Sequence, residues 1–265
     1  MSKEAVLSKV PAVTLGFWII KILATTLGET GGDAVTMSWL GETTAHPNPN
    51  GYLIGTAIFF SLLAAFVAIQ IVAKKFHPFL YWATIVASTT AGTTLADFAD
   101  RSLGIGYTGG TSVLLACVLL TLAVWYRVEG TVSVTSVNRP RVEAFYWLTI
   151  TFSQTLGTAL GDWMADTSGL GYLGAAAVFG GGLALLALAY YATSLSRVAL
   201  FWAAFILTRP LGATVGDFFD KPFEHGGLNV SRPVATAIIA VAMVGCILLI
   251  PQRAGAHPSG ESAPR

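Results

Sequence analysis

Residues 18–33 read WIIKILATTLGETGGD. The same frame returns at residues 82–97 (WATIVASTTAGTTLAD), 147–162 (WLTITFSQTLGTALGD) and 202–217 (WAAFILTRPLGATVGD). Each copy has Trp, nine residues, Gly, three residues, Gly or Ala, and a final Asp. Because the spacing is the same in all four copies, the chain is built from an internal repeat, and its fold is that of one unit used four times.

The repeat also holds most of the acidic side chains. The motif aspartates are Asp33, Asp97, Asp162 and Asp217. Three copies add a carboxylate about one helical turn later, and the first copy has one a turn earlier: Asp100, Asp166, Asp220 and Glu29. All seven aspartates, and eight of the 14 acidic residues, therefore belong to the repeat. These eight side chains are the candidate metal ligands.

Composition places the chain in a membrane. It has 265 residues, of which 54% are hydrophobic and 11% charged, and its mean hydropathy is +0.67. A helical span needs about 20 apolar residues, and eight segments qualify: 12–33, 52–73, 78–100, 109–127, 142–166, 171–192, 197–220 and 232–250. The sequence predicts an all-α membrane protein, with eight transmembrane helices in one domain that covers residues 1–265.

Two spans make one repeat, with approximate bounds 10–73, 78–127, 142–192 and 197–250. Since each repeat crosses the membrane an even number of times, the four motif helices run in the same direction and carry their acids at the same face. We expect a pseudo-symmetric bundle, an arrangement that often forms a transport path between repeats.

Lysine and arginine give the orientation. They are concentrated in both tails and in the loops after the even-numbered spans, which contain Lys74, Lys75, Arg127, Arg139, Arg141 and Arg197. The positive-inside rule then puts both termini in the cytoplasm and the acids at the outer face of the membrane. No cleavable signal is recognisable before the first span. Residues 251–265, rich in Pro, Gly and Ser, are expected to be a disordered cytoplasmic tail.

The motif combines three physical features. Trp opens each motif helix and is expected at the lipid headgroups. Two small residues four positions apart let neighbouring helices approach closely. The Asp follows about 22 Å after the Trp, in the outer part of the hydrocarbon layer. Gathered there, the carboxylates require cations or protons, because charge is costly within a membrane. Alternatively, Asp100, Asp166 and Asp220 are solvated or pair with Arg101 and Lys221.

Two basic residues interrupt the repeat within the spans. Lys21 stands where the other copies have Ile85, Ile150 and Phe205, and Arg209 stands where they have Thr25, Thr89 and Gln154. Arg209 lies two turns before Asp217 and is able to pair with a carboxylate of a neighbouring helix. Lys21 has the alternative of extending to the inner interface. Both are candidate counter-ions for the acid site.

The ligand set suggests the ion. Carboxylates dominate it, helped by hydroxyls of Thr30, Thr94 and Thr214 in the same turns. Such oxygen ligands suit Mg²⁺, Ca²⁺ or Mn²⁺, whereas copper and zinc favour thiolate or imidazole. The metal is expected as a substrate, and no covalent cofactor is expected.

The four copies of a two-helix unit, each with its Trp and Gly-x-x-x-[Gly/Ala]-Asp end, resemble a bacterial membrane-protein family. That family is defined by four tandem repeats of unknown function, and the resemblance covers nearly the whole chain. It implies a multi-pass protein of the bacterial inner membrane. Residues 28–33 (GETGGD) are also similar to the Glu-x-Gly-Asp signature of small manganese and calcium exchangers. Here the spacing from Glu to Asp is one residue longer, and Ala34 replaces the basic residue. This second resemblance favours manganese.

Three classes of function remain. The first is a secondary transporter of a divalent cation, with Mn²⁺ favoured, whose carboxylates exchange metal for protons. The second is a proton-coupled transporter of another cationic or small polar solute. The third is a structural or sensory membrane protein; no enzyme is expected, since the spans lack histidine-rich metal spacing and nucleophile pairs. We expect a lipid bilayer, a metal cation and protons as partners and no nucleic acid; whether the chain forms a homo-oligomer stays open.

Overall fold

The computed structural model describes residues 7–42 and 50–256. This part of the chain forms eight long helices: α1 (Leu15–Asp33), α2 (Gly51–Val72), α3 (Pro78–Asp97), α4 (Tyr107–Glu129), α5 (Pro140–Asp162), α6 (Gly171–Ala192), α7 (Arg197–Asp220) and α8 (Arg232–Leu249). Short π-helical turns follow three motif aspartates, at Ala34–Trp39, Phe98–Ser102 and Trp163–Thr167. Two 3-10 turns lie at Val134–Ser136 and Phe223–His225. The motif helices thus continue unbroken through their glycines to the aspartates.

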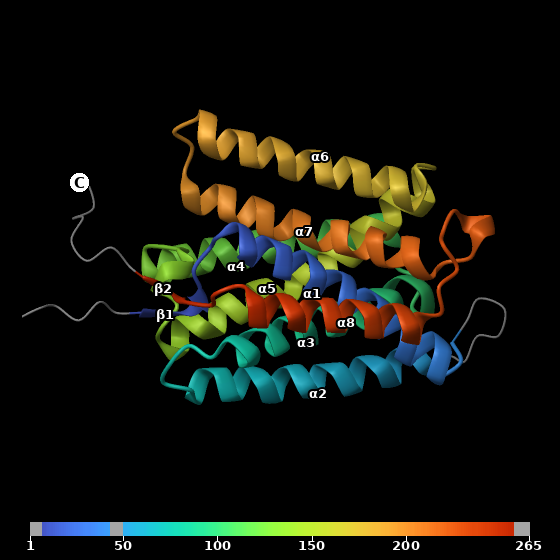
Figure 1. Cartoon of the computed structure of the whole chain (residues 1–265), viewed down its shortest axis with the longest axis horizontal. Helices are drawn as coiled ribbons and strands as arrows, with labels where there is room; N and C mark the ends of the chain where they lie inside the picture. The colour runs from blue at the N-terminus through green and yellow to red at the C-terminus, as the bar shows by residue number, and fades with distance from the viewer. Residues whose placement is uncertain (1–6, 43–49, 257–265) are drawn as a thin grey trace, which may run out of the picture.

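The four motif helices form a ring inside the bundle. Helix α1 packs against α3 and α7, and α5 packs against the same two helices. The second helix of each repeat does not pack mainly on its own motif helix but on that of the next repeat: α2 on α3, α4 on α5 and α6 on α7. Helix α8 closes the circle by packing on α1 (Figure 1). Four units in a closed ring confirm the repeat organisation and give the bundle its pseudo-fourfold symmetry.

The inner and outer helices differ in polarity. The helices that are long and apolar enough to cross a membrane are the four outer helices, α2, α4, α6 and α8, and the inner helix α7. Helices α1, α3 and α5 fall short of that criterion because they carry threonines, serines and charged side chains, most of them buried between helices. Large exposed apolar side chains such as Leu119, Leu185 and Val241 lie on the outer helices. The apolar surface indicates a multi-pass membrane protein.

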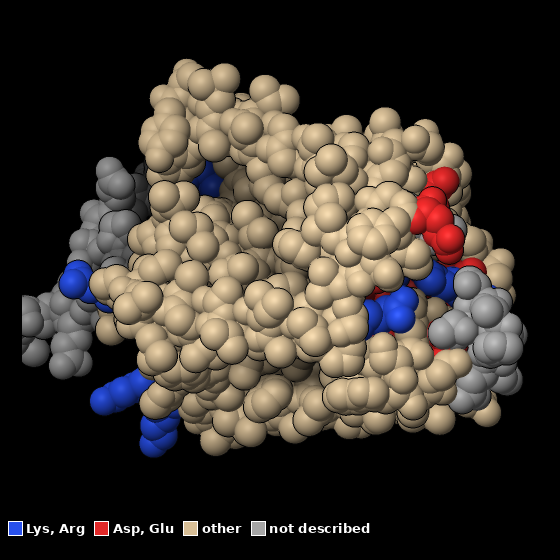
Figure 2. Space-filling model, turned by 45° about the vertical axis from the view of Figure 1, so that its right-hand side comes forward, with Lys and Arg blue, Asp and Glu red and all other residues tan. Residues whose placement is uncertain are grey.

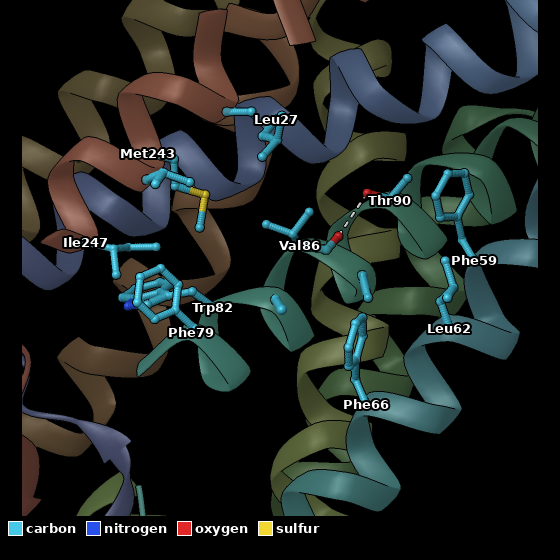
Figure 3. A pocket seen from close by; sticks show the side chains of 14 residues that line it. Leu27, Phe59, Leu62, Phe66, Phe79, Trp82, Val86, Thr90, Met243 and Ile247 are labelled. Atoms are coloured by element: carbon cyan, nitrogen blue, oxygen red, sulfur yellow. Dashed lines mark hydrogen bonds between the residues drawn. The ribbon is translucent and has the colours of Figure 1, made fainter. Parts of the chain in front are cut away.

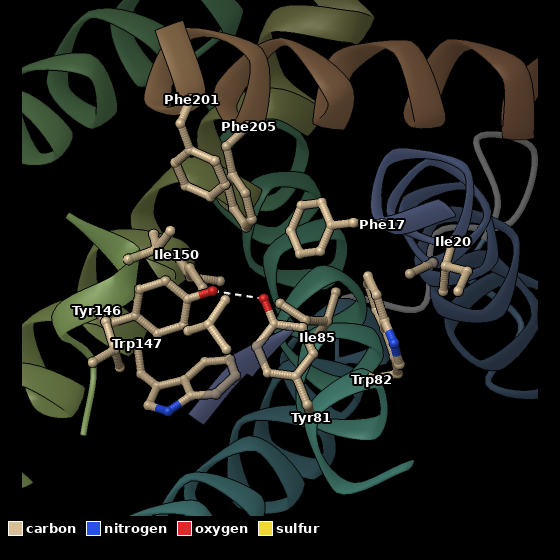
Figure 4. Packing of buried hydrophobic residues seen from close by; sticks show 14 of the residues in the cluster. Phe17, Ile20, Tyr81, Trp82, Ile85, Tyr146, Trp147, Ile150, Phe201 and Phe205 are labelled. Atoms are coloured by element: carbon tan, nitrogen blue, oxygen red, sulfur yellow. Dashed lines mark hydrogen bonds between the residues drawn. The ribbon is translucent and has the colours of Figure 1, made fainter. Parts of the chain in front are cut away.

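An aromatic layer closes the bundle axis near the start of the motif helices. Phe17, Tyr81, Tyr146 and Phe201 immediately precede the four motif tryptophans, and the Tyr81 and Tyr146 hydroxyls are 2.6 Å apart (Figure 4). Three of the tryptophans, expected at the headgroups, are instead buried in this core, at no more than 4% exposure: Trp82, Trp147 and Trp202. The indole N–H groups of Trp82 and Trp202 donate to protein partners there, the Gln252 side-chain oxygen (3.1 Å) and the Val132 carbonyl (2.9 Å). The tryptophans therefore tie the helices to one another.

A two-stranded antiparallel sheet covers the same end of the bundle. Strand β1 (Leu7–Pro11) pairs with β2 (Ala254–Ala256), as Figure 1 shows beside the starts of the motif helices. Ser8 donates to the Val134 carbonyl (2.7 Å), and the Lys9 ammonium is 2.6 Å from Glu143. The first residues of the tail expected to be disordered are thus ordered by pairing with β1, while residues 257–265 lie outside the described part.

The first glycine of each motif is a point of close contact between neighbouring inner helices. The contacts repeat around the ring: Gly28 with Thr89, Gly92 with Gln154, Gly157 with Arg209, and Gly212 with Thr25. In each pair the partner stands three residues before the first glycine of the adjoining inner helix. The second small residue makes the next contact, as Gly32 does with Thr93 and Gly216 with Glu29. This interlock fixes the register of all four aspartates.

A test of the interlock compares two Gly-to-Ala substitutions. A Cβ at Gly92 would lie 2.8 Å from the Thr155 backbone nitrogen, whereas one at Gly181 of α6 would have no atom within 4 Å. We expect Gly92→Ala to lower the free energy of unfolding by about 1 to 3 kcal/mol through overpacking. Gly181→Ala is expected to be neutral or to stabilise, by up to about 1 kcal/mol, through helix propensity. Thermal unfolding in detergent measures both, and equal stability of the two variants would contradict the interlock.

Candidate cation site

The four motif aspartates lie together at the end of the bundle opposite the aromatic layer. Asp33, Asp97 and Asp162 are the last residues of α1, α3 and α5, and Asp217 lies in the last turn of α7. Each is 3% exposed or less. Figure 2 shows acidic and basic side chains gathered at one end of the molecule and further basic side chains at the opposite end, with few charged side chains on the surface between them. The shared face expected from the even number of crossings is what the structure shows.

Two basic residues link these aspartates in pairs. The Lys221 ammonium is 2.8 Å from Asp33 Oδ2 and 2.9 Å from Asp217 Oδ1. Arg101 Nε is 3.0 Å from Asp97 Oδ1, and its Nη2 is 3.3 Å from Asp162 Oδ2. Each cation therefore joins the aspartate one turn before it to the aspartate of a neighbouring motif helix. The four motif helices are arranged with pseudo-fourfold symmetry, whereas their ion pairs follow a twofold pattern.

Electrostatics fixes the charge of Lys221, which follows α7 directly. Burial alone would lower the pKa of its ammonium group, but the carboxylates of Asp217, Asp33 and Asp220 outweigh burial and hold the pKa well above its usual value. Lys221 is therefore a permanent cation at the acid end as the structure shows it. It neutralises about one of the two aspartates that it contacts.

A third cation lies deeper in the axis. Arg209 Nη2 is 2.7 Å from Glu29 Oε2 and 2.7 Å from Thr93 Oγ1, and it also contacts Thr158 Oγ1. Arg209 extends from α7 to meet α1, α3 and α5, and none of its side chain is exposed. The expected pairing of Arg209 with a carboxylate of a neighbouring helix is present, and the acid is Glu29.

Lys21 behaves differently from the other buried cations. Its Nζ atom lies 4.2 Å from the centre of the Phe205 ring and has no hydrogen-bond partner. The residue is fully buried, so its side chain does not extend to the interface. No ion pair involving Lys21 is found in the described residues, which leaves its expected role as a direct counter-ion without support in this conformation.

Three carboxylates converge closely enough to share one metal ion. Glu29, Asp33 and Asp217 each offer an oxygen, and these three atoms lie within 4.8 Å of one another. Oxygens bound to Ca²⁺ at 2.3 to 2.6 Å are separated by at most about 5 Å, so the spacing fits a single cation. Asp33 Oδ1 is buried and has no hydrogen-bond partner, although Oδ2 of the same carboxylate contacts Lys221. An acceptor is thus available to a ligand.

The remaining candidate ligands do not join this triad. Asp97 and Asp162 are held by Arg101. Asp100 is buried against Gly110, Asp220 is 3.6 Å from Arg232 Nε, and Asp166 is exposed. The hydroxyls of Thr30, Thr94 and Thr214 all donate to carbonyls of their own helices. Of the eight candidate acids, all of which lie in the described residues, three lie close enough together to share one ion.

The alternative that Asp100, Asp166 and Asp220 are solvated or pair with Arg101 and Lys221 holds in part, since Asp166 is exposed and Asp220 acts electrostatically on Lys221. That the direct ion pairs of Arg101 and Lys221 are with motif aspartates was not predicted from the sequence. A usable signal was present, since both residues stand four positions after a motif aspartate, one helical turn away. The contributions of Thr93 and Thr158 had no such signal, because they depend on which helices are neighbours.

An apolar cavity of about 320 Å³ lies apart from these charges, between α2, α3 and α8 (Figure 3). Phe59, Phe66, Trp82 and Met243 are among its lining residues. Its one polar lining residue, Thr90, donates its hydroxyl hydrogen bond to the Val86 carbonyl (2.9 Å). The cavity suits hydrocarbon and offers no ligands to a cation.

Comparison with known families agrees with the repeat geometry. The family described as Repeat of Unknown Function (DUF347) matches the chain four times, at residues 16–76, 80–131, 145–196 and 200–251. The chain belongs to this family. Each DUF347 repeat contains one inner helix and the following outer helix. No curated protein and no solved structure matches the chain.

The buried pair of Arg209 and Glu29 allows a test of how much this ion pair contributes to the folding stability of the DUF347 protein. Arg209→Met leaves the Glu29 carboxylate buried without its cation, and we expect a loss of about 3 to 5 kcal/mol in unfolding free energy. The double variant with Glu29→Gln removes both charges and should recover most of that loss. Denaturant unfolding in detergent completes the double-mutant cycle.

The control for this cycle is an ion pair whose cation is exposed and whose carboxylate keeps a second partner, Arg141, at 3.4 Å from Glu129. Arg139 contacts Glu129 at 2.7 Å, and 66% of its side chain is exposed. We expect Arg139→Met to cost no more than about 1 kcal/mol. Additive effects of the two substitutions at Arg209 and Glu29 would contradict a coupled buried pair.

Proposed function

We propose that this chain is a secondary transporter in the bacterial inner membrane that exchanges a divalent metal cation for protons. The observation that carries the proposal is the buried triad of Glu29, Asp33 and Asp217, whose oxygens converge within 4.8 Å. A carboxylate in a membrane is costly, and such residues usually mark an ion pathway. Three of them on two adjacent helices are therefore a candidate substrate site.

The proposed arrangement has all eight helices crossing the membrane, with both termini in the cytoplasm. Helices of 18 to 24 residues extend about 27 to 36 Å, which matches the hydrocarbon core. The polar inner helices α1, α3 and α5 are shielded from lipid by the outer helices. The positive-inside rule supports placing the β1–β2 end at the cytoplasm and the aspartates outside.

Charge balance supports exchange. Direct ion pairs at the acid end join five buried carboxylates to three cations: Glu29, Asp33, Asp97, Asp162 and Asp217 to Arg101, Arg209 and Lys221. Asp220 and Arg232, 3.6 Å apart, add one charge of each sign, and Asp100 lies outside these ion pairs. If the five carboxylates and three cations are all ionised, two negative charges remain. One divalent cation or two protons would neutralise them, which gives electroneutral exchange a physical basis.

The all-oxygen triad suits a hard ion. The similarity of residues 28–33 to manganese and calcium exchangers favours Mn²⁺ among the hard ions. Lys221 would take part in the exchange, because it contacts two triad residues, Asp33 and Asp217. A metal ion bound there would compete with the ammonium, and Lys221 would return when the metal leaves.

The two ends of the axis offer different access. At the acid end, Arg101 and Lys221 have side chains 28% and 11% exposed. At the opposite end, the aromatic layer is covered by β1 and β2. This conformation is more easily opened towards the acid end, which the proposed orientation makes the outside.

Calorimetric titration with Mn²⁺, Ca²⁺, Mg²⁺ and Zn²⁺ tests the metal site directly. We expect saturable binding of Mn²⁺ by the folded protein in detergent. Asp33→Asn and Asp217→Asn should each weaken binding at least about tenfold, or 1.4 kcal/mol, because each removes a charged ligand. The matched control is Asp166→Asn, an exposed acid of the same motif end, which should leave affinity unchanged.

Absence of binding by demonstrably folded wild-type protein would contradict the metal site. It would favour proton-coupled transport of another cationic or small polar solute, or a role without transport. Where Mn²⁺ does bind, uptake of ⁵⁴Mn²⁺ by proteoliposomes separates a transporter from a protein that binds the metal without transporting it.

Cysteine labelling tests the proposed orientation. Ser168 and Ser194 are exposed and lie at opposite ends of α6. With Cys117 and Cys246 replaced by Ala, we expect Ser168→Cys to react with a membrane-impermeant maleimide in intact cells. Ser194→Cys should react only after permeabilisation, and the reverse pattern would invert the topology.

A further inference from the structure

Lys21 is a buried titratable group that the metal site does not use. Its Nζ atom is fully enclosed and has no hydrogen-bond partner. The other buried basic residues of the described chain, Lys9 and Arg209, each contact a carboxylate at 2.6 or 2.7 Å. A nearby carboxylate holds a proton on a basic group. Lys21 lacks that constraint.

Packing does not explain the amine. The corresponding positions of the other repeats are Ile85, Ile150 and Phe205, all fully buried apolar residues. The bundle therefore accepts hydrocarbon at this level in three of four repeats. An amine here imposes a desolvation cost whenever it is charged and adds no hydrogen bond to the fold. Its presence at this buried position calls for a chemical role.

The charged groups around Lys21 do not fix its proton. On α7, Arg209 lies one turn beyond Phe205 and repels an ammonium. The charged residues of α3 and α8, Asp97 and Arg232, stand at the far end of the bundle. The other titratable groups of these two helices are the hydroxyl of Tyr81, bonded to Tyr146, and the thiol of Cys246.

Phe205 makes the charged form attainable. The Nζ atom lies 4.2 Å from the ring centre, within the range of cation–π attraction. The ring offers an ammonium a modest gain without the strong attraction of a carboxylate. The site thus accommodates the neutral amine and, when the surrounding charge permits, the ammonium. Either state is accessible to a group that must gain and lose a proton.

We infer that Lys21 carries one of the protons exchanged for the metal, an inference that rests on the proposed function. With metal bound, the five carboxylates, three cations and one divalent ion sum to zero, and Lys21 is a neutral amine. When the metal leaves, the amine lone pair takes one proton from that side of the membrane, and a carboxylate takes the second. Both protons go to the opposite side when the next metal ion enters.

The test uses full-length protein in proteoliposomes with ⁵⁴Mn²⁺ and an internal pH dye. Lys21→Met keeps the length of the side chain and removes the titratable nitrogen. We expect it to bind Mn²⁺ within about threefold of wild type and to retain Mn²⁺/Mn²⁺ exchange. Net uptake driven by a pH gradient should fall at least tenfold, with loss of the accompanying proton flux. Lys21→Arg, with its permanent charge, should also lose proton-coupled uptake.

Ile150→Met, at the same register of α5, is the matched control and should leave both modes intact. Normal proton coupling in folded Lys21→Met or in Lys21→Arg would overturn the role of Lys21 while leaving the metal site standing. Absence of Mn²⁺ binding and transport in wild type would overturn both proposals together. Loss of binding and of Mn²⁺/Mn²⁺ exchange in Lys21→Met would also count against it, because it would show a structural role.

Discussion

The close contact between inner helices at the first motif glycine sets the geometry on which the acid end depends. This contact involves the first glycine of each motif: Gly28, Gly92, Gly157 and Gly212. Each of these glycines packs against the residue that stands three positions before the first glycine of an adjoining motif helix. In a lipid environment helices gain little from apolar burial against one another, so close packing at small residues decides how they associate. Because the contact is repeated around a closed ring, a shift of one helix would disturb its neighbours on both sides. The carboxylates five residues later are held at one level by this constraint.

Charge then breaks the symmetry that packing creates. One turn after the motif aspartates, the four repeats have Met37, Arg101, Asp166 and Lys221. Cations in the second and fourth repeats are sufficient to bridge all four aspartates, since each contacts its own helix and a neighbouring one. A further asymmetry follows the first glycines, where Glu29 stands in a ring with Thr93, Thr158 and Ala213. Because only the first repeat has this extra acid, the described residues contain one triad. It lies beside Lys221 rather than Arg101.

Structural features that depend on one helix could be predicted from the sequence. Features that depend on which helices are neighbours could not. Spacing along the chain was enough to predict the repeats, the eight helices and the shared face of the aspartates. It did not reveal that α8 closes the ring on α1, or that Arg209 reaches Thr93 and Thr158 on two other helices. The tryptophans were misplaced for a related reason: an indole suits both a headgroup and an aromatic core, and residue type alone does not distinguish them. The ordered residues after Ile250 depend on β1, more than 240 positions away.

The order of charges along the axis favours exchange over leakage. Below the triad, a metal ion moving inward meets Arg209 and then the level of Lys21, before the aromatic layer. Two cations in a medium of low dielectric constant repel a divalent ion strongly, so an open route would still present a barrier. That barrier falls when Arg209 remains paired with a carboxylate and Lys21 is uncharged. Conversely, protonation of Lys21 restores it once the metal has gone. In the proposed cycle the same nitrogen that carries a proton would therefore keep metal from crossing when protons occupy the site.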